Sequence, residues 1–306
     1  MTSLPWVGRG SGRRRDKSLI AIAGDTSELP ERDVMISSSL AVVALIVIWF
    51  LTQVLVLGSL EHERAQDRLY AELRQDLAAG TAPTGGIIAP GRPVALFEMT
   101  DLGIGEVVVE GTSAGQTIGG PGHRRDTVLP GQAGISVVYA RSTTFGGPFD
   151  AMVSDAIGKN LTVVTGQGRS TYRIEGVRRP GDPAPAPPAE GQGRLTLVTS
   201  EGSGPLAALR PGQVVYVEAS LQSKAHPGGG QRVNTISASE NAMKGDRSVL
   251  PMLALVLGGL LVALVGSLLA RERFGSVIAW TVGIPIIATL AWFAADLSVY
   301  LLPNIV

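Results

Sequence analysis

Ser200 is the residue whose type and position point most directly to chemistry, because it closes the strand-like run "RLTLVTS" among small residues. A hydroxyl presented at the end of a strand could act as a nucleophile. Serine is a weak nucleophile, however, and needs an adjacent general base, as in Ser-His or Ser-Lys pairs. The sequence contains no cysteine, which excludes a thiol nucleophile, a thiolate metal site and disulfides.

Few bases are available to activate Ser200. The candidates are His62, His123, His226, Lys159 and Lys224. His123, in the segment "GPGH", is more typical of a histidine that serves loop structure, and no pattern directs the other candidates at Ser200. The surrounding "VTSEG" is not the G-x-S-x-G elbow of serine hydrolases. The glycines of "GIGEVVVEG" form no dinucleotide-binding fingerprint, because no helix follows them.

The sequence gives little indication of a metal site or of nucleic-acid binding. Two acidic pairs, Asp101 with Glu106 and Asp150 with Asp155, raise the question of calcium. Neither pair makes the dense cluster of oxygen ligands that calcium requires, so we interpret both as solvated turn and helix residues. The formal net charge is zero, which gives no indication of a nucleic-acid partner. We expect no metal and no cofactor.

Three apolar blocks account for the high hydrophobic content of 45%. The first, Leu40 to Leu57, carries no charge and is long enough to cross a hydrocarbon core of about 30 Å. It begins too far along the chain, and is too long, for a typical signal peptide, so we predict a retained anchor. The second and third blocks are separated only by "RERF" and indicate a helical hairpin. We place the three transmembrane helices at residues 36–58, 249–270 and 275–302.

The basic residues predict the orientation in the membrane. Arg and Lys residues precede the first span, and Arg271 and Arg273 lie in the hairpin turn, which places both regions in the cytoplasm. The segment between the first two spans and the C-terminus are then extracytoplasmic, in a protein of the cell membrane. Asp296, near the outer end of the last span, is expected at the interface. Gly258, Gly259 and Gly266 form a small-residue face that fits either a partner helix or packing inside the hairpin.

The remaining segments have distinct compositions. Residues 1–35 predict a disordered cytoplasmic tail. Residues 59–92 predict an amphipathic helix, Leu60 to Ala79, and a linker; the helix could stand as a stalk, pack on the next domain or bind a partner. Residues 93–221 contain many short Val- and Ile-rich runs, a hairpin across Gly166 to Gly168 and one short helix at 148–157, which is typical of a closed barrel or a sandwich. Residues 222–248 predict a second linker.

The order of landmarks in this β-rich region resembles the sortases. The segments are "VEGTSAGQTIGGPGHRRDTVLPGQAG", "YARSTTFGGPF" and "LTLVTS", and the likeness covers about Pro93 to Leu221. More narrowly, they are similar to the class E sortases of actinobacteria, which are membrane-anchored cysteine transpeptidases. The resemblance implies an eight-stranded β-barrel. The fold class that we expect is therefore mainly β, with a sortase-like closed β-barrel outside the membrane and three transmembrane α-helices.

The resemblance also identifies the positions that carry catalysis in the family. Its members use a histidine, a cysteine that closes a "TLxTC" strand, and an arginine, to cut an LPXTG-like sorting signal and join the cargo to the cell wall. In this chain Arg141 stands at the histidine position and Ser200 at the cysteine position. Arg210 matches the arginine, although "RPGQ" spaces it differently.

Two changed catalytic positions favour a pseudoenzyme. A guanidinium stays protonated and offers only donors, so Arg141 cannot activate Ser200. We therefore expect an extracytoplasmic binding or scaffold component of a cell-envelope complex. Its groove could hold an extended peptide near Arg141, Ser200 and Arg210, and its partners would be the membrane and other envelope proteins. Two alternatives stay open: an active transpeptidase or hydrolase that uses Ser200, and a rigid cap on a functional membrane hairpin.

Overall fold

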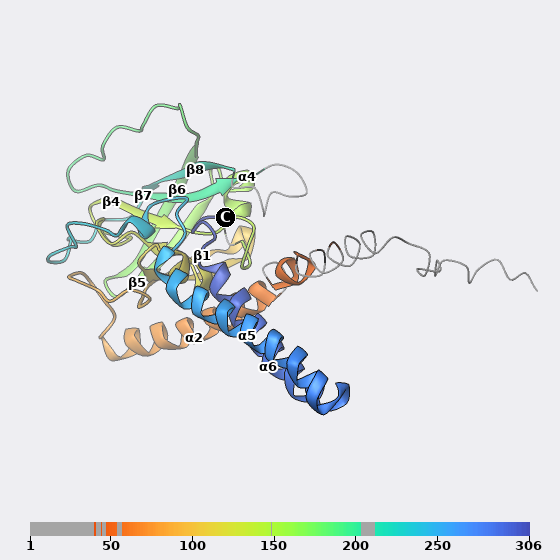
Figure 1. The fold of residues 1–306 in the computed structure, drawn as a ribbon. Coiled ribbons are helices and arrows are strands. Elements are labelled where there is room, and N and C mark those ends of the chain that lie inside the picture. Colours follow the sequence, from red (N-terminus) through yellow and green to blue (C-terminus); the bar gives the residue numbers. More distant parts are fainter. Residues whose placement is uncertain (1–39, 41–43, 45–46, 54–56, 148, 203–211) are drawn as a thin grey trace, which may run out of the picture. The chain divides into compact units, whose positions relative to one another are not determined.

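The computed structural model describes residues 40, 44, 47–53, 57–147, 149–202 and 212–306 (Figure 1). The predicted cytoplasmic tail, most of the first predicted span and Arg210 lie outside the described residues. The chain divides into the units Met1–Trp49 and Phe50–Val306, and the description below concerns the second unit.

Eight strands form a closed barrel in the second unit. They pair in the order β1-β2-β3-β4-β7-β8-β6-β5. Closure leaves no long unpaired edge for another chain to join. The strands are β1 (Pro93–Met99), β2 (Ile104–Glu110), β3 (Gly122–His123), β4 (Gly134–Tyr139), β5 (Asn160–Thr165), β6 (Gly168–Arg178), β7 (Gly193–Glu201) and β8 (Gln213–Leu221). The predicted closed barrel is confirmed.

Local sequence patterns predicted the positions of most of these strands and helices. Thr165 pairs with Gly168 across the predicted hairpin, and Gly168 has a φ of +127°, which a residue with a side chain rarely adopts. The predicted helix at 148–157 contains α4 (Asp150–Asp155). The sequence did not indicate β3 or the short helix α3 (Ala114–Gly119), because two residues of strand and six of helix are too short to show a period.

The barrel interior is apolar and fully closed to solvent at its centre. Phe97, Phe149, Met152, Leu161 and Tyr172 belong to one buried cluster. The hydroxyl of Tyr172 is the one polar atom among these side chains, and it accepts a hydrogen bond from the backbone N–H of Gly131 at 2.6 Å. A buried tyrosine with this partner packs as a large apolar side chain without an unsatisfied hydroxyl.

Helix α2 (Gly58–Ala79) packs on the barrel. Leu73 is buried, and the amide of Gln66 bonds to β2: its Oε1 accepts from the N–H of Val107 at 2.7 Å and its Nε2 donates to the Val107 carbonyl at 3.2 Å. Strand β3 reaches β2 only at Val109 and Glu110, so Gln66 satisfies a backbone edge that β3 is too short to cover. Of the alternatives for this helix, the structure has the one in which it packs on the next domain.

His62 joins the start of α2 to the barrel. Its Nδ1 lies 3.1 Å from the carbonyl oxygen of Ile118 and its Nε2 lies 3.0 Å from a carboxylate oxygen of Glu106. Burial lowers the pKa of His62, but the hydrogen bond and charge of Glu106, the Ile118 carbonyl and the charge of Glu63 together raise it, so the pKa lies above the ordinary 6.5. Glu106 is thus a partly buried ion-pair partner, and our interpretation of it as a solvated turn residue was wrong; Asp101 is exposed as expected.

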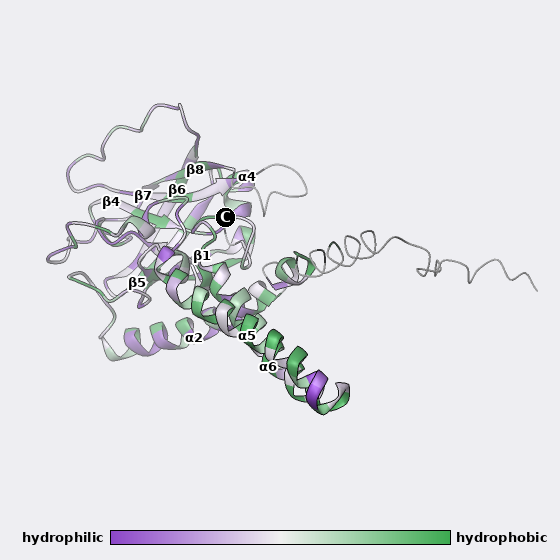
Figure 2. Ribbon diagram, in the orientation of Figure 1, coloured by the Kyte–Doolittle hydropathy of each residue, from purple (hydrophilic) through white to green (hydrophobic). Residues whose placement is uncertain are grey.

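The helices α5 (Leu250–Phe274) and α6 (Ser276–Val299) follow the barrel. Both are long and apolar enough to cross a membrane, and the ribbon in Figure 2 shows that hydrophobic residues predominate along them. They pack closely where a Cβ on Gly283 would collide with Ser267, and a Cβ on Gly259 would contact Leu290. No atom of the described residues lies within 4 Å of where a Cβ would stand on Gly258 or Gly266, so part of the small-residue face is open.

The expected description of the whole chain as mainly β was wrong. It fits residues 93–221, but α2, α5 and α6 contain 22, 25 and 24 residues and together exceed the eight strands. The reason is that the second and third apolar blocks and the amphipathic segment are each one long helix, whereas the strands have 11 residues or fewer. Two of the three predicted spans are present as apolar helices, and most of the first lies outside the described residues.

The His62–Glu106 pair predicts a stability that falls at alkaline pH. The raised pKa of His62 means that its contribution is complete below about 6.5 and is lost as the pH rises through the folded-state value. Thermal unfolding of the full-length protein in detergent, measured between pH 5.5 and 9, should show this decline. Glu106→Gln should flatten it, whereas Glu72→Gln, a change at an exposed residue of α2, should leave it intact. An equal slope in the Glu106→Gln variant would exclude the pair as its cause.

Candidate functional site

The parallel pairing of β4 with β7 builds the candidate site. Val137 pairs with Thr196 and Tyr139 with Val198, and the backbone N–H of Ala140 donates to the Val198 carbonyl at 3.0 Å. Parallel strands in register end at the same edge of a sheet. The residues that follow β4 therefore meet the last residues of β7, and the predicted juxtaposition of the Arg141 and Ser200 segments is present.

Ser200 is buried and hydrogen-bonded on both sides. Its Oγ lies 2.8 Å from the Oγ of Ser142 and donates to the carbonyl oxygen of Ile305 at 2.9 Å. The Ser142 hydroxyl also lies 3.5 Å from the Ile305 carbonyl. Ser200 thus bonds a second hydroxyl and a backbone carbonyl, and neither of these is a base that could take its proton at neutral pH.

Arg141 is fully buried beside this pair. Its Nη1 donates to the Thr144 hydroxyl at 3.0 Å and to the Val306 carbonyl oxygen at 3.2 Å, and its Nη2 donates to the Ala114 carbonyl at 3.4 Å. The guanidinium also lies 5.0 Å from the centre of the Phe145 ring. Burial lowers the pKa of Arg141 to about 9, so the side chain remains a cation at neutral pH. Among the described residues no acidic side chain pairs with it.

The loop after Arg141 is held in an unusual backbone conformation. Phe145 has a φ of +52° and is followed by Gly146 and Gly147, at +82° and +50°. A bulky residue in this region is strained unless its surroundings fix it. Phe145 packs with Ile118 and Val299, and a Cβ on Gly58 would stand 2.9 Å from its ring, so α2, α3 and α6 together hold the loop.

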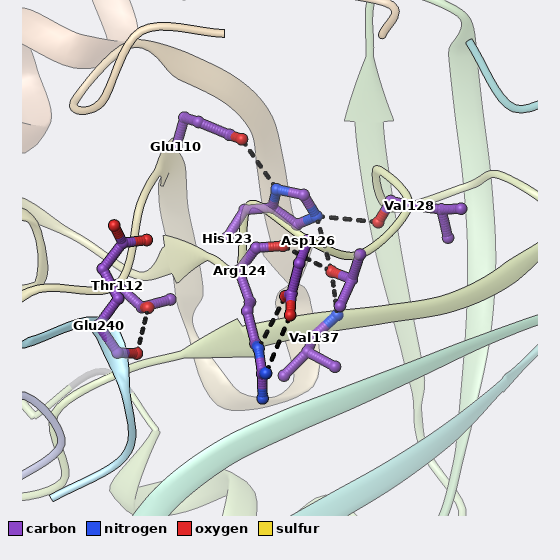
Figure 3. A network of polar contacts seen from close by, with 9 residues as sticks. Glu110, Thr112, His123, Arg124, Asp126, Val128, Val137 and Glu240 are labelled. Atoms are coloured by element: carbon purple, nitrogen blue, oxygen red, sulfur yellow. Dashed lines mark hydrogen bonds and ion pairs between the residues drawn. The ribbon is translucent and has the colours of Figure 1, made fainter. Parts of the chain in front are cut away.

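The histidines proposed as bases are engaged elsewhere. The His123 ring lies between Glu110, 2.8 Å from its Nδ1, and the Val128 carbonyl, 2.8 Å from its Nε2 (Figure 3). It therefore fixes the turn that follows it, as the sequence indicated. His62 bonds Ile118 and Glu106, and the backbone of His226 bonds Gly131 and Ala133. Over the described ranges, no histidine or lysine side chain hydrogen-bonds to Ser200 or Ser142.

In the part of the chain that the structure describes, no group of three or more candidate metal ligands occurs. The acidic pairs therefore form no metal site there. Asp150 and Asp155 are exposed, as expected for solvated helix residues. Asp296 and Glu61 line the same surface cavity between α2 and α6.

Three components of the site were not predicted. Ser142 and Thr144 follow Arg141 in "RSTTFGG", a segment that the sequence analysis used only as a landmark, and its run of hydroxyl residues was the available signal. The third component is the C-terminal segment, residues 303–306, which follows α6 and bonds to Arg141, Ser142, Thr144 and Ser200. No sequence pattern indicated this segment's role, because its contacts join residues 162 to 165 positions apart or 105 apart.

Solved structures of sortases are similar to this chain. A sortase D5 transpeptidase from Clostridium perfringens is 17% identical, covers 54% of this chain and 100% of its own, and gives a TM-score of 0.41. Sortase E from Streptomyces avermitilis is 24% identical over 50% of this chain and 100% of its own, with a TM-score of 0.36. The SrtF sortase from Corynebacterium diphtheriae is 21% identical over 52% of this chain and 98% of its own, with a TM-score of 0.38.

This likeness concerns the fold alone, and it agrees with the resemblance that the sequence indicated. No protein-family model matches the sequence, and the comparison with curated proteins found no match.

The two serines predict a measurable coupling. Ser142→Ala and Ser200→Ala should each lower the free energy of unfolding by about 0.5–1.5 kcal/mol, because each removes a buried hydrogen bond. The double variant should cost less than the sum of the two, since one of the bonds is shared. Denaturant unfolding of the full-length protein measures this cycle. Ser154→Ala, at an exposed serine of α4, is the control, and strict additivity of Ser142→Ala with Ser200→Ala would contradict the contact.

Proposed function

We propose that this chain is a membrane-anchored, extracytoplasmic protein whose sortase-like barrel binds a peptide segment without cleaving it. It would serve as a binding or scaffold component of a cell-envelope complex. The proposal rests on the composition of the site. Ser200 hydrogen-bonds to Ser142 and to a backbone carbonyl. A buried cation, Arg141, occupies the position where a base would be needed. Hydrolysis through Ser200 would require a proton acceptor that this arrangement does not supply.

The same side chains are suited to binding. Four donors converge on two consecutive main-chain oxygens, those of Ile305 and Val306: they come from Arg141, Thr144, Ser142 and Ser200. Such donors recognise the main chain of a peptide whatever its side chains are.

The membrane helices support the proposed location. Arg271 and Arg273 stand in the last turn of α5, at the end of the hairpin away from the barrel connection. With this end in the cytoplasm, the barrel and the segment after α6 lie on the opposite side of the membrane. An envelope partner would reach the barrel there.

Assays of peptide cleavage and of partner capture distinguish the binding function from the catalytic one. The full-length protein in detergent should leave LPXTG-type sorting peptides uncut and untransferred over hours, as mass spectrometry would show. Gentle detergent extraction and affinity capture should instead recover a membrane or envelope partner. Peptide turnover that Ser200→Ala abolishes would overturn the proposal in favour of a serine transpeptidase or hydrolase.

Arg141 is the residue on which partner capture should depend. Arg141→Gln removes the charge, keeps a donor and should lower capture at least tenfold, whereas Ser200→Ala removes one neutral donor and should lower capture less. Arg141→Glu would place an uncompensated negative charge among carbonyl oxygens in a buried site and is expected to destabilise the barrel as well. Arg169→Gln is the control, because its side chain is 69% exposed on β6. Equal capture by the Arg141→Gln and wild-type proteins would contradict the role of the site.

A further inference from the structure

The C-terminal segment, residues 303–306, is buried from Asn304 onward. Asn304 and Ile305 have no exposed surface and Val306 is 3% exposed. The position of the C-terminus among the strands can be followed in Figure 1. Burial this complete, in a segment that directly follows an apolar helix, indicates a bound segment and not a loose extension.

The main chain of the segment is held by the candidate site. The Ile305 carbonyl accepts from Ser200 and the Val306 carbonyl accepts from Arg141 and Thr144. The N–H of Val306 lies 3.4 Å from the Pro303 carbonyl, so the segment enters the site as a tight turn. The site thus contains a turn of the chain in place of the extended peptide that the sequence led us to expect there.

Asn304 is recognised through its side chain. Its Nδ2 donates to the carbonyl of Thr112 at 2.6 Å and to that of Asn241 at 3.0 Å, and its backbone N–H donates to the Lys244 carbonyl at 3.1 Å. Two carbonyls that converge on one NH₂ group select an amide over a carboxylate, which has no hydrogen to donate. These acceptors come from the barrel and from the segment after β8, so the pocket for Asn304 is formed by parts of the chain far apart in sequence.

Ile305 fills an apolar pocket on the outside of the barrel. It forms one buried cluster with Tyr139 and Val198, at the ends of β4 and β7, and further apolar side chains close the pocket. These are Val137, Val214, Tyr216, Ala242 and Met243. The pocket fits a branched aliphatic side chain and would exclude a charged one, because burying an unpaired charge is strongly unfavourable.

We propose that residues 303–306 are the resident ligand of the Arg141–Ser200 site, and that this site recognises a turn with an amide side chain followed by a branched aliphatic one. The inference rests on the binding function proposed above and describes its regulation. A partner peptide has to displace the segment, and displacement releases the end of α6 from the barrel. Val299, in the last turn of α6, packs on Phe145, which lies over Arg141, so the site and the membrane hairpin share one set of contacts.

The absence of cysteine from the sequence allows a clean test of occupancy. Ser200→Cys introduces a single thiol beneath the segment in the full-length protein in its membrane. Its labelling by a water-soluble maleimide should be slow. Adding Ile305→Asp should speed labelling at least tenfold, because a carboxylate is expelled from the apolar pocket. Adding Ile135→Asp should leave the rate unchanged, since Ile135 is an isoleucine of β4 that is already 41% exposed.

Unfolding of the barrel is checked with a separate thiol. Val217→Cys lies in the barrel core and should stay protected when combined with Ile305→Asp. If that thiol becomes reactive, Asn304→Ala replaces Ile305→Asp in the experiment, because it keeps the apolar contact and removes only the amide bonds. Unchanged labelling of Ser200→Cys in a folded Ile305→Asp or Asn304→Ala variant would overturn the proposal.

A disulfide identifies which chain supplies the segment. Ser200→Cys combined with Ile305→Cys should form a bond within one chain under mild oxidation. Thr199→Cys with Val215→Cys, neighbours across β7 and β8, is the positive control for the oxidant. A bond between two chains would show that the segment comes from a second copy and would overturn the proposal. None of these measurements needs a partner, so a failure to capture one bears only on the proposed binding function.

Discussion

The parallel pairing of β4 with β7 is the constraint on which the rest of the site depends. Because these two strands run in the same direction and in register, the segment after Tyr139 and the end of the Ser200 strand reach the same edge of the barrel. A slip of one residue would turn alternate side chains to the other face of the sheet. The contact between Ser142 and Ser200 and the placement of Arg141 follow from this register.

Arg141 gives the site its electrostatic character. A buried guanidinium is costly unless its donors are satisfied. Here Nη1 and Nη2 donate to the Thr144 hydroxyl and two main-chain oxygens, with the Phe145 ring nearby, while Nε has no hydrogen-bond partner among the described residues. A cation in this position can hold the oxygen of a peptide but cannot take a proton from Ser200. Arg141, Ser142, Thr144 and Ser200 thus form a set of donors, in which the hydroxyls and the guanidinium act together on a bound main chain.

The site is also a junction between the barrel and the helices around it. His62 of α2 bonds the Ile118 carbonyl, and Ile118 packs with Phe145 and Val299. Arg141, the loop around Phe145, the start of α2 and the end of α6 are therefore in continuous contact. An event that moves one of these elements has to rearrange the packing of the others, because close-packed side chains leave little room for independent shifts.

The sequence by itself determined the elements with a strong local period. Hydrophobic patterns that repeat every 2 or 3.6 residues account for the alternating strands, the hairpin at Gly168, the amphipathic α2 and the apolar α5 and α6. The landmarks around Arg141 and Ser200 located two site residues. Only the tertiary structure decided that α2 packs on β2, that His62 pairs with Glu106, and that Asn304 and Ile305 occupy the site. Those contacts join residues 41 to 192 positions apart, and no local pattern encodes which distant groups meet when a barrel closes.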